Sequence, residues 1–217
     1  MQIPVLYENE WLLVVNKPAG IQVEASIHGY PSIESWARQY LSANSKKPPL
    51  VGIVHRLDRP VSGVLVLAKK KAALQQLNAQ WAQRQVKKVY LAVVEKVPVA
   101  PEAMLVHYLK RDMEGKKSLI FDTPVKAAAM CRLDYQIVAE KKGGFLLKIQ
   151  LHTGKFHQIR AQLAHIGCPI LGDALYGSTS LYRQNAIALH AWQLECTDPL
   201  TQKLICIEAH HPFEMFD

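Results

Sequence analysis

Short apolar runs alternate along the chain with segments in which apolar residues recur at helical spacing. Residues spaced three or four apart predict helices over Ser32–Ser42, from Ala72 to about Val86, and over His157–Ile166. Runs rich in β-branched residues predict strands at Val5–Tyr7, Trp11–Val15, Val64–Ala68, Val89–Val94, Phe145–Leu151, Ala186–Leu194 and Leu204–Ile207. Because strands and helices mix without strict β-α-β alternation, the pattern favours an α+β fold around a mainly antiparallel sheet flanked by helices.

The remaining segments and the composition limit the class of protein. Residues 44–50 and 98–122 are rich in Pro, Lys and Glu and are predicted to be surface loops. No stretch approaches the ~20 consecutive apolar residues of a membrane span, and the N-terminus lacks the basic start of a secretory signal. The four cysteines stand alone, which predicts reduced thiols. We therefore expect a single globular domain over residues 1–217, in the cytoplasm and most simply a monomer.

Basic residues are concentrated in one part of the chain. The formal net charge is +8, and residues 44–90 hold ten basic side chains and one acidic side chain. Such a segment attracts polyanions and releases counterions when it contacts phosphates, so it indicates nucleic-acid binding. The alternative is a solubilising surface made of lysine runs such as Lys69-Lys70-Lys71. The one acid in this segment is Asp58.

Asp58 lies in the sequence His55-Arg56-Leu57-Asp58-Arg59-Pro60-Val61-Ser62-Gly63, between two apolar runs. Catalytic groups are often carried on loops of this kind, and flanking guanidinium groups favour the ionised form of a carboxylate. The same residues would also suit an ordinary turn with an aspartate cap and a surface ion pair. Taken alone, the loop supports both interpretations equally.

Four ordered motifs make the chain resemble the RluA-type RNA pseudouridine synthases. HRLDRPVSG is similar to that family's HRLDxxTSG signature, and residues 16–20, NKPAG, are similar to its NKPxG motif. Residues 87–94, KKVYLAVV, resemble its strand with a catalytic tyrosine. Residues 151–160, LHTGKFHQIR, with GCPILGD (167–173) and YG (176–177), resemble its TGRxHQIR…GxPIxGDxxYG block. Motifs found in this order over nearly the whole chain are far more specific than any one of them.

The resemblance implies a fold and a reaction. The fold is the pseudouridine synthase fold, with a central catalytic cleft, and the chain would start at the catalytic domain without the S4-type RNA-binding domain that many relatives carry. The reaction is the isomerisation of uridine in rRNA or tRNA, in which the C1′–N1 bond breaks, uracil rotates and a C1′–C5 bond forms. It needs a carboxylate, exclusion of water and a base for the C5 proton, and no metal or other cofactor.

The resemblance also assigns roles to residues. Asp58 is expected to be the catalytic carboxylate, Arg160 to form an ion pair with it, and Tyr90 to stack on uracil and act in deprotonation at C5. Arg56 is expected to enter the RNA stack in place of the flipped base. The further expected RNA contacts are His55, Arg59, Lys69, Lys70, Lys71 and Lys88.

The chain departs from the family pattern at four positions, and two other functions stay open. Val61 stands where Thr is usual, Lys155 and Phe156 where Arg and a small hydroxyl residue are usual, and Gln162 where His is common. One alternative is a binding module without turnover. The other is a nucleosidase or RNA glycosidase that uses Asp58, for which Asp173 would be the second acid, although Asp173 reads more simply as a turn cap.

Overall fold

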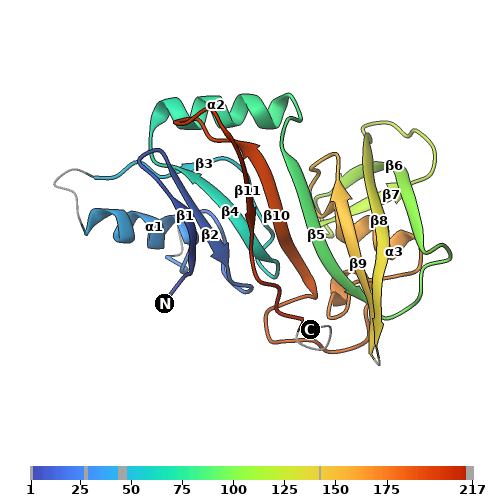
Figure 1. Ribbon diagram of the computed structural model, residues 1–217. Helices are drawn as coiled ribbons and strands as arrows, with labels where there is room; N and C mark the ends of the chain where they lie inside the picture. Colours follow the sequence, from blue (N-terminus) through green and yellow to red (C-terminus); the bar gives the residue numbers. More distant parts are fainter. Residues whose placement is uncertain (1, 27–28, 44–47, 142, 214–217) are drawn as a thin grey trace. The chain divides into compact units, whose positions relative to one another are not determined.

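The computed structural model describes residues 2–26, 29–43, 48–141 and 143–213 (Figure 1). The helices are α1 (Ile33–Ser42), α2 (Lys71–Ala82), α3 (Gln158–His165) and the short 3-10 helix η1 (Ala174–Tyr176). The strands are β1 (Val5–Glu8), β2 (Leu12–Lys17), β3 (Gly52–Ile53), β4 (Ser62–Ala68), β5 (Lys87–Val94), β6 (Glu102–Asp112), β7 (Lys117–Phe121), β8 (Ala129–Lys141), β9 (Gly144–Leu151), β10 (Leu189–Thr197) and β11 (Leu204–Glu208). The predicted α+β class is confirmed.

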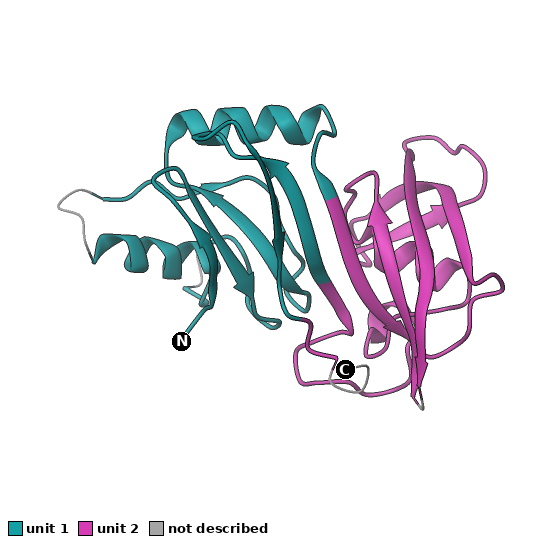
Figure 2. Cartoon of the chain, in the orientation of Figure 1, with its two compact units in different colours: residues 1–87, 191–210 teal, residues 88–190, 211–217 magenta. Residues whose placement is uncertain are grey.

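The chain folds into two compact units (Figure 2). Unit 1 comprises Met1–Lys87 and Ala191–His210, and unit 2 comprises Lys88–His190 and His211–Asp217. Each unit therefore includes segments that are distant in the sequence. Asp58 belongs to unit 1, whereas Tyr90 and Arg160 belong to unit 2.

Unit 1 is built on neighbouring strands in the order β1-β2-β4-β10-β11, and β3 also pairs with β4. The pairs β1–β2, β2–β4, β3–β4 and β10–β11 are antiparallel. Helix α2 packs against β3 and β4. The core consists of side chains from these elements, mainly Leu12, Val14, Val64, Val66, Ala68, Ala73, Leu77, Leu194, Cys196 and Ile207.

The predicted start of the first helix is confirmed in detail. Ser32 precedes α1 with an extended backbone, and its hydroxyl oxygen accepts a hydrogen bond from the backbone N–H of Ser35 at 3.0 Å. This bond satisfies one of the amide groups that have no partner within a first helical turn. Ile33 and Ala37 lie on the buried face of the helix.

Unit 2 is an antiparallel sheet in the order β5-β9-β8-β6-β7, with α3 packed against β6 and β7. Gly167 follows the C-terminal end of α3 with φ at +79°, a backbone conformation that glycine adopts at little cost. Six of the eight residues of α3 are buried, Arg160 among them. Burial of this helix therefore extends to polar residues outside the apolar stripe seen in its sequence.

The prediction of a surface loop over residues 98–122 was wrong, because this segment forms β6 and β7. Leu105, His107 and Leu109 are buried on β6, while the alternating residues Met104 and Val106 are exposed. This is the two-residue period of a strand, but its Pro, Lys and Glu content hid it. Strand β8 was likewise not predicted. The predicted loop at 44–50 falls partly on residues 44–47, which lie outside the described residues.

Two smaller expectations can be compared with the structure. All four cysteines are free, and Cys131, Cys168 and Cys196 are buried. In the described part of the chain, the structure contains no helix that is both long and apolar enough to cross a membrane.

Candidate active site

Asp58 lies in a short loop of unit 1 that is anchored at both ends. Leu57 points into the core with 6% of its surface exposed, whereas Asp58 beside it is half-buried. The carbonyl oxygen of Asp58 accepts a hydrogen bond from Val61 N–H at 3.0 Å, which closes a tight turn. Gly63 follows with φ at +121°, and a Cβ there would lie 2.2 Å from the carbonyl oxygen of Ala191. The loop can return into β4 on this path only with glycine at that position.

The loop over residues 16–20 holds the Asp58 loop from the side. Gly20 N–H donates to the carbonyl oxygen of Arg59 at 2.8 Å, and Arg59 Nε–H donates back to the carbonyl oxygen of Gly20 at 3.1 Å. Lys17 Nζ lies 3.3 Å from the same Arg59 carbonyl oxygen. Two of the four sequence motifs are therefore joined next to Asp58.

Lys17 is a residue whose role the sequence did not reveal. Its side chain is fully buried, and Nζ donates to the carbonyl oxygens of Pro18 at 2.9 Å and Ile21 at 2.7 Å. Burial lowers the pKa of Lys17 to about 7, and the negative charge of Asp58 opposes this shift. The one sequence feature that could have indicated its burial is its position directly after the apolar run 12–15 and Asn16.

The arginines and the histidine of the Asp58 loop differ in their surroundings. Arg56 is 69% exposed and forms an ion pair with the exposed Glu24 at 3.0 Å, which is a weak interaction in water. Its guanidinium group is therefore accessible to a ligand. His55 accepts a hydrogen bond from Val66 N–H at 3.1 Å and stacks on Trp81, so these contacts tie it to the scaffold.

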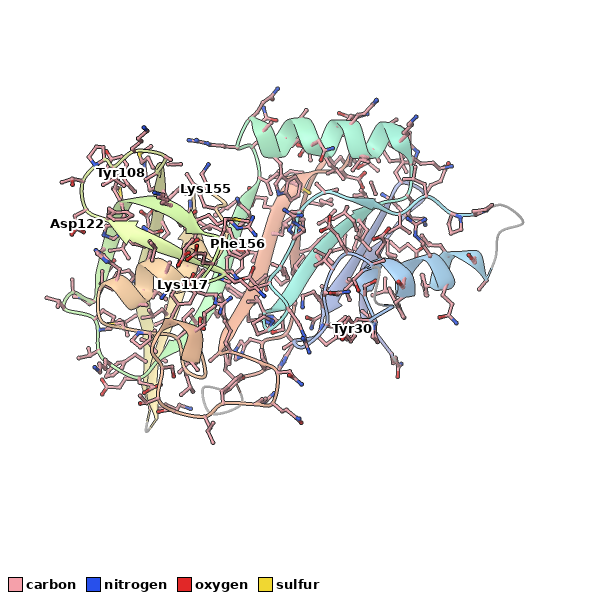
Figure 3. The ribbon with its side chains drawn as sticks, turned by 180° about the vertical axis from the view of Figure 1, so that it is seen from behind. Tyr30, Tyr108, Lys117, Asp122, Lys155 and Phe156 are labelled. Carbon is pink, nitrogen blue, oxygen red and sulfur yellow. The ribbon has the colours of Figure 1, made fainter. Side chains whose placement is uncertain are left out.

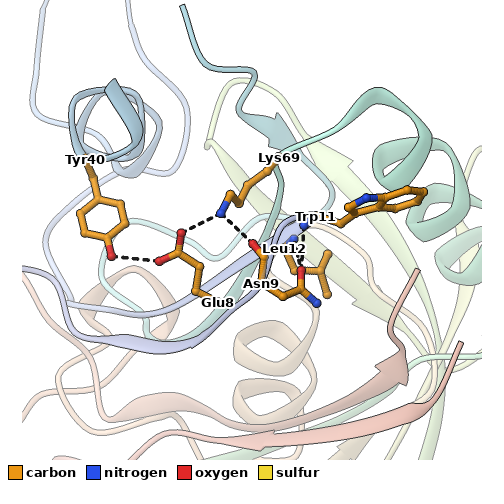
Figure 4. Close-up of polar contacts among 6 residues, drawn as sticks. All are labelled: Glu8, Asn9, Trp11, Leu12, Tyr40 and Lys69. Carbon is orange, nitrogen blue, oxygen red and sulfur yellow. Dashed lines mark hydrogen bonds and ion pairs between the residues drawn. The ribbon is translucent and has the colours of Figure 1, made fainter. Parts of the chain in front are cut away.

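The three consecutive lysines also differ. Lys69 Nζ donates to Glu8 Oε1 and to the carbonyl oxygen of Asn9, both at 2.7 Å, and Tyr40 bonds the other oxygen of Glu8 (Figure 4). Lys69 is therefore held within unit 1. Lys70 lies 3.4 Å from Glu10 and is half-exposed, and Lys71 begins α2 with an exposed side chain.

In unit 2, Tyr90 and Lys88 lie on one face of β5. Val89 lies between them in the sequence and Leu91 follows Tyr90, and both are buried on the other face of the strand. Tyr90 pairs with Ile149 of the neighbouring strand β9. Tyr90 is only partly buried. Lys88 Nζ lies 3.5 Å from the position that a Cβ of Gly154 would occupy, which places this amine beside the loop before α3.

Arg160 forms a buried ion pair with Asp173. Arg160 Nε donates to Asp173 Oδ2 at 2.6 Å and Nη2 donates to Oδ1 at 2.8 Å, with the side chains 6% and 1% exposed. The guanidinium carbon also lies 5.1 Å from the ring centre of Tyr176. Asp173 precedes η1 but makes no side-chain capping bond, so the turn-cap interpretation was wrong. Asp58 and Arg160 belong to different units, and their predicted ion pair stays a prediction.

A family model described as RNA pseudouridylate synthase matches residues 11–165, more than half of the chain. The chain belongs to this family. The match covers the Asp58 loop, the Tyr90 strand and all of α3. The resemblance recognised from the four motifs is thereby confirmed.

Curated members of the pseudouridylate synthase family align over almost the whole chain. Ribosomal large subunit pseudouridine synthase D of Nitrosomonas europaea is 33% identical over 98% of this chain and 63% of its own length. Ribosomal large subunit pseudouridine synthase C of Buchnera aphidicola is 32% identical over 94% of this chain and 66% of its own length. An uncharacterized RNA pseudouridine synthase of Zymomonas mobilis is 33% identical, with 96% and 93% covered. The chain thus spans less than two thirds of the first two relatives.

Solved structures support the fold. Human RNA pseudouridylate synthase domain containing 1 superposes with a TM-score of 0.79 at 24% identity, covering 98% of this chain and 84% of its own. Human RNA pseudouridylate synthase domain containing 4 gives 0.78 at 23% identity, with 97% and 89% covered. The expected pseudouridine synthase fold is confirmed.

Proposed function

We propose that this protein isomerises uridine in RNA to pseudouridine, with Asp58 as the catalytic carboxylate and without a cofactor. The observation that carries the proposal is the Asp58 loop itself. Asp58 is only half-buried, while the backbone on both sides is fixed by a turn, by the Gly20–Arg59 bonds and by the packing of Leu57. A carboxylate held on a rigid support at an incompletely buried position suits attack on, or stabilisation of, a cation-like C1′.

Basic residues accompany Asp58. Arg56 and Arg59 flank it in the sequence, and its negative charge acts on the buried amine of Lys17. The three routes open to Asp58 are attack on C1′, attack on C6 and removal of a proton from C2′.

The remaining roles follow the family pattern. Tyr90, on a partly exposed strand face, would stack on the flipped uracil and act in C5 deprotonation. Arg160 stays a candidate for the ion pair with Asp58, and its bond to Asp173 would fix the orientation of its guanidinium group. Arg56, with its weak exposed partner, would enter the RNA stack.

The target that we propose is ribosomal RNA. The relatives from Nitrosomonas and Buchnera are named as ribosomal large subunit enzymes, and this supports rRNA over tRNA for this chain. Among the lysines, Lys70, Lys71 and Lys88 would contact phosphates, whereas Lys69 is engaged by Glu8. We further propose that the protein is a single catalytic domain that acts as a monomer in the cytoplasm.

The glycosidase alternative loses its main support in the structure. It needed Asp173 as a second, accessible acid, but both oxygens of Asp173 accept hydrogen bonds from Arg160 and the side chain is 1% exposed. Both oxygens of this carboxylate are therefore engaged by Arg160, and neither is available to a substrate.

The test is Asp58→Asn, assayed by mass spectrometry of nucleosides after incubation with large-subunit rRNA that lacks pseudouridine. We expect loss of pseudouridine formation with RNA binding retained, because the change keeps volume and leaves the phosphate contacts intact. Glu34→Gln is the matched control, since it makes the same acid-to-amide change in unit 1 at a carboxylate that pairs with Arg38. Pseudouridine formation by Asp58→Asn near the wild-type rate would refute the assignment, and free uracil in the wild-type product would favour a glycosidase.

A further inference from the structure

Phe156 is the centre of a second surface of unit 2 that the proposed reaction does not explain. Its ring is 37% exposed, and the guanidinium carbon of Arg111 lies 4.3 Å from its centre. On Phe156, the imidazole of His157 is stacked at 3.8 Å between ring centres with an interplanar angle of 19°. The small hydroxyl residue that the family pattern favours at position 156 has no ring with which to make either contact.

The loop that carries Phe156 is fixed from three directions. Ser118 Oγ donates to the carbonyl oxygen of Phe156 at 2.5 Å, and Ser118 N–H donates to the hydroxyl oxygen of Tyr176 at 2.7 Å. The same hydroxyl lies 3.1 Å from His157 Nδ1. His157 has φ at +52°, a left-handed conformation that is uncommon for a residue with a side chain and costs about 1 kcal/mol or more. These contacts hold the strained loop with Phe156 at the surface.

Arg111 is thereby presented as a flat cationic group. It lies near the end of β6, opposite Ser118 on β7, and its side chain is exposed. A guanidinium group stacked on an aromatic ring loses rotational freedom in the free protein, so less is lost when a ligand binds. Its N–H edge can donate to phosphate oxygens, and a guanidinium plane can stack with a nucleobase.

Positive charge flanks this pair. Lys155 precedes Phe156 and is exposed, and Lys117 starts β7 next to Ser118 (Figure 3). Flat cationic and aromatic groups between lysines are the combination with which proteins bind unpaired RNA: the lysines contact the backbone and the planar groups stack on bases.

We propose that Arg111, Lys117, Lys155 and Phe156 form an RNA-contact surface, in which Phe156 holds the Arg111 guanidinium group flat for a base and a phosphate outside the reacting uridine. The inference rests on the proposed function and deepens it, because it assigns part of the recognition of the RNA to unit 2. Phe156 is a positioning residue in this scheme and acts through Arg111.

The test is binding of a fluorescein-labelled, single-stranded RNA of twelve uridines, measured by fluorescence anisotropy across a series of salt concentrations. Arg111→Lys keeps the charge but removes the flat group, and Phe156→Leu keeps apolar packing but removes the ring. We expect each to weaken binding about five-fold or more with an unchanged salt slope, as for loss of one stacking contact. We expect the double variant to be no weaker than the singles, because both remove the same contact. Lys155→Gln should instead lower the salt slope by about one.

The matched control is Arg183→Lys, because Arg183 is also an exposed arginine of unit 2 with its guanidinium carbon over a ring, 5.6 Å from the centre of Tyr182. Thermal melting of every variant, followed by circular dichroism, identifies loss of folding. Wild-type affinity in folded Arg111→Lys and Phe156→Leu, or an equal loss in the control, would overturn the proposal. Because this assay needs no turnover, it is separate from the Asp58→Asn test: turnover by that variant would overturn the proposed function and leave the binding result standing.

Discussion

Removing the charge of Asp173 tests how unit 2 is held together around Arg160. Asp173→Asn keeps the size of the side chain and one carbonyl oxygen as an acceptor. The guanidinium group then remains 6% exposed, without the carboxylate that accepts two hydrogen bonds at 2.6 and 2.8 Å. The cation–π contact with Tyr176 at 5.1 Å is retained in this variant.

The expected loss in the free energy of unfolding is about 3 to 5 kcal/mol, the range for removal of one partner from a buried ion pair. A cation–π contact is worth about 0.5 to 2 kcal/mol and cannot replace the carboxylate. Since domains are stable by only about 5 to 15 kcal/mol, the variant should unfold at a clearly lower urea concentration.

The assay is urea unfolding followed by circular dichroism, for Asp173→Asn, Arg160→Met and the double variant. If the two groups form one pair, the double variant loses less than the sum of the singles, by about 2 kcal/mol or more. Arg38→Met is the control, because Arg38 pairs with Glu34 at 51% exposure and should lose less than about 1 kcal/mol. A loss below about 1 kcal/mol for Asp173→Asn, or strictly additive losses, would refute this account of the pair.

Three further predictions concern unit 1. The pKa of Lys17 is lowered to about 7 from 10.5, so the unfolded chain binds more protons than the folded chain between these values, and the free energy of unfolding should rise with pH across that window. Lys17→Met should remove this rise, measured as the free energy of unfolding at pH 7 and pH 9, and an unchanged rise would contradict a buried amine. Gly63→Ala should destabilise by about 2 kcal/mol or more, since its Cβ would lie 2.2 Å from Ala191 O, and a melting temperature equal to wild type would disprove the close approach. Charge reversal at exposed Lys71 should flatten the salt dependence of RNA binding more than reversal at ion-paired Lys69; equal effects would show that the ion pair with Glu8 does not decide which lysine meets phosphate.

Local signals predicted most of the secondary structure, because the relevant interactions are close in sequence. The Ser32 cap, the apolar strands of unit 1 and the glycine after α3 are each decided within a few residues. Strands β6 and β8 were not predicted, because no clear local sequence signal marks them as strands. Their exposed faces carry charged residues together with Met104 and Val106, so neither composition nor apolar content separated the buried face from the exposed face.

The candidate site was predictable where a motif carried it and not where packing decided it. Asp58 stood out as the one acid in a basic segment. The bond between Arg160 and Asp173 spans a helix end and a turn, and nothing in the sequence ranks Asp173 above other acids as its partner. The burial of Lys17 depends on carbonyl groups supplied by two loops, which only the folded chain brings together.

Burial divides the four departures from the family pattern into two kinds. Val61 is 2% exposed, and Gln162 is fully buried with hydrogen bonds to Gln158, His107 and the Leu105 carbonyl oxygen. Substitutions at such positions act on packing and on the satisfaction of buried polar groups, so their effect is felt in stability. Lys155 and Phe156 are exposed, and the loop that carries them is held through its backbone by Ser118. If the protein acts on RNA as proposed, a difference in the RNA that it selects is therefore to be sought at positions 155 and 156, where a change of side chain alters the exposed surface.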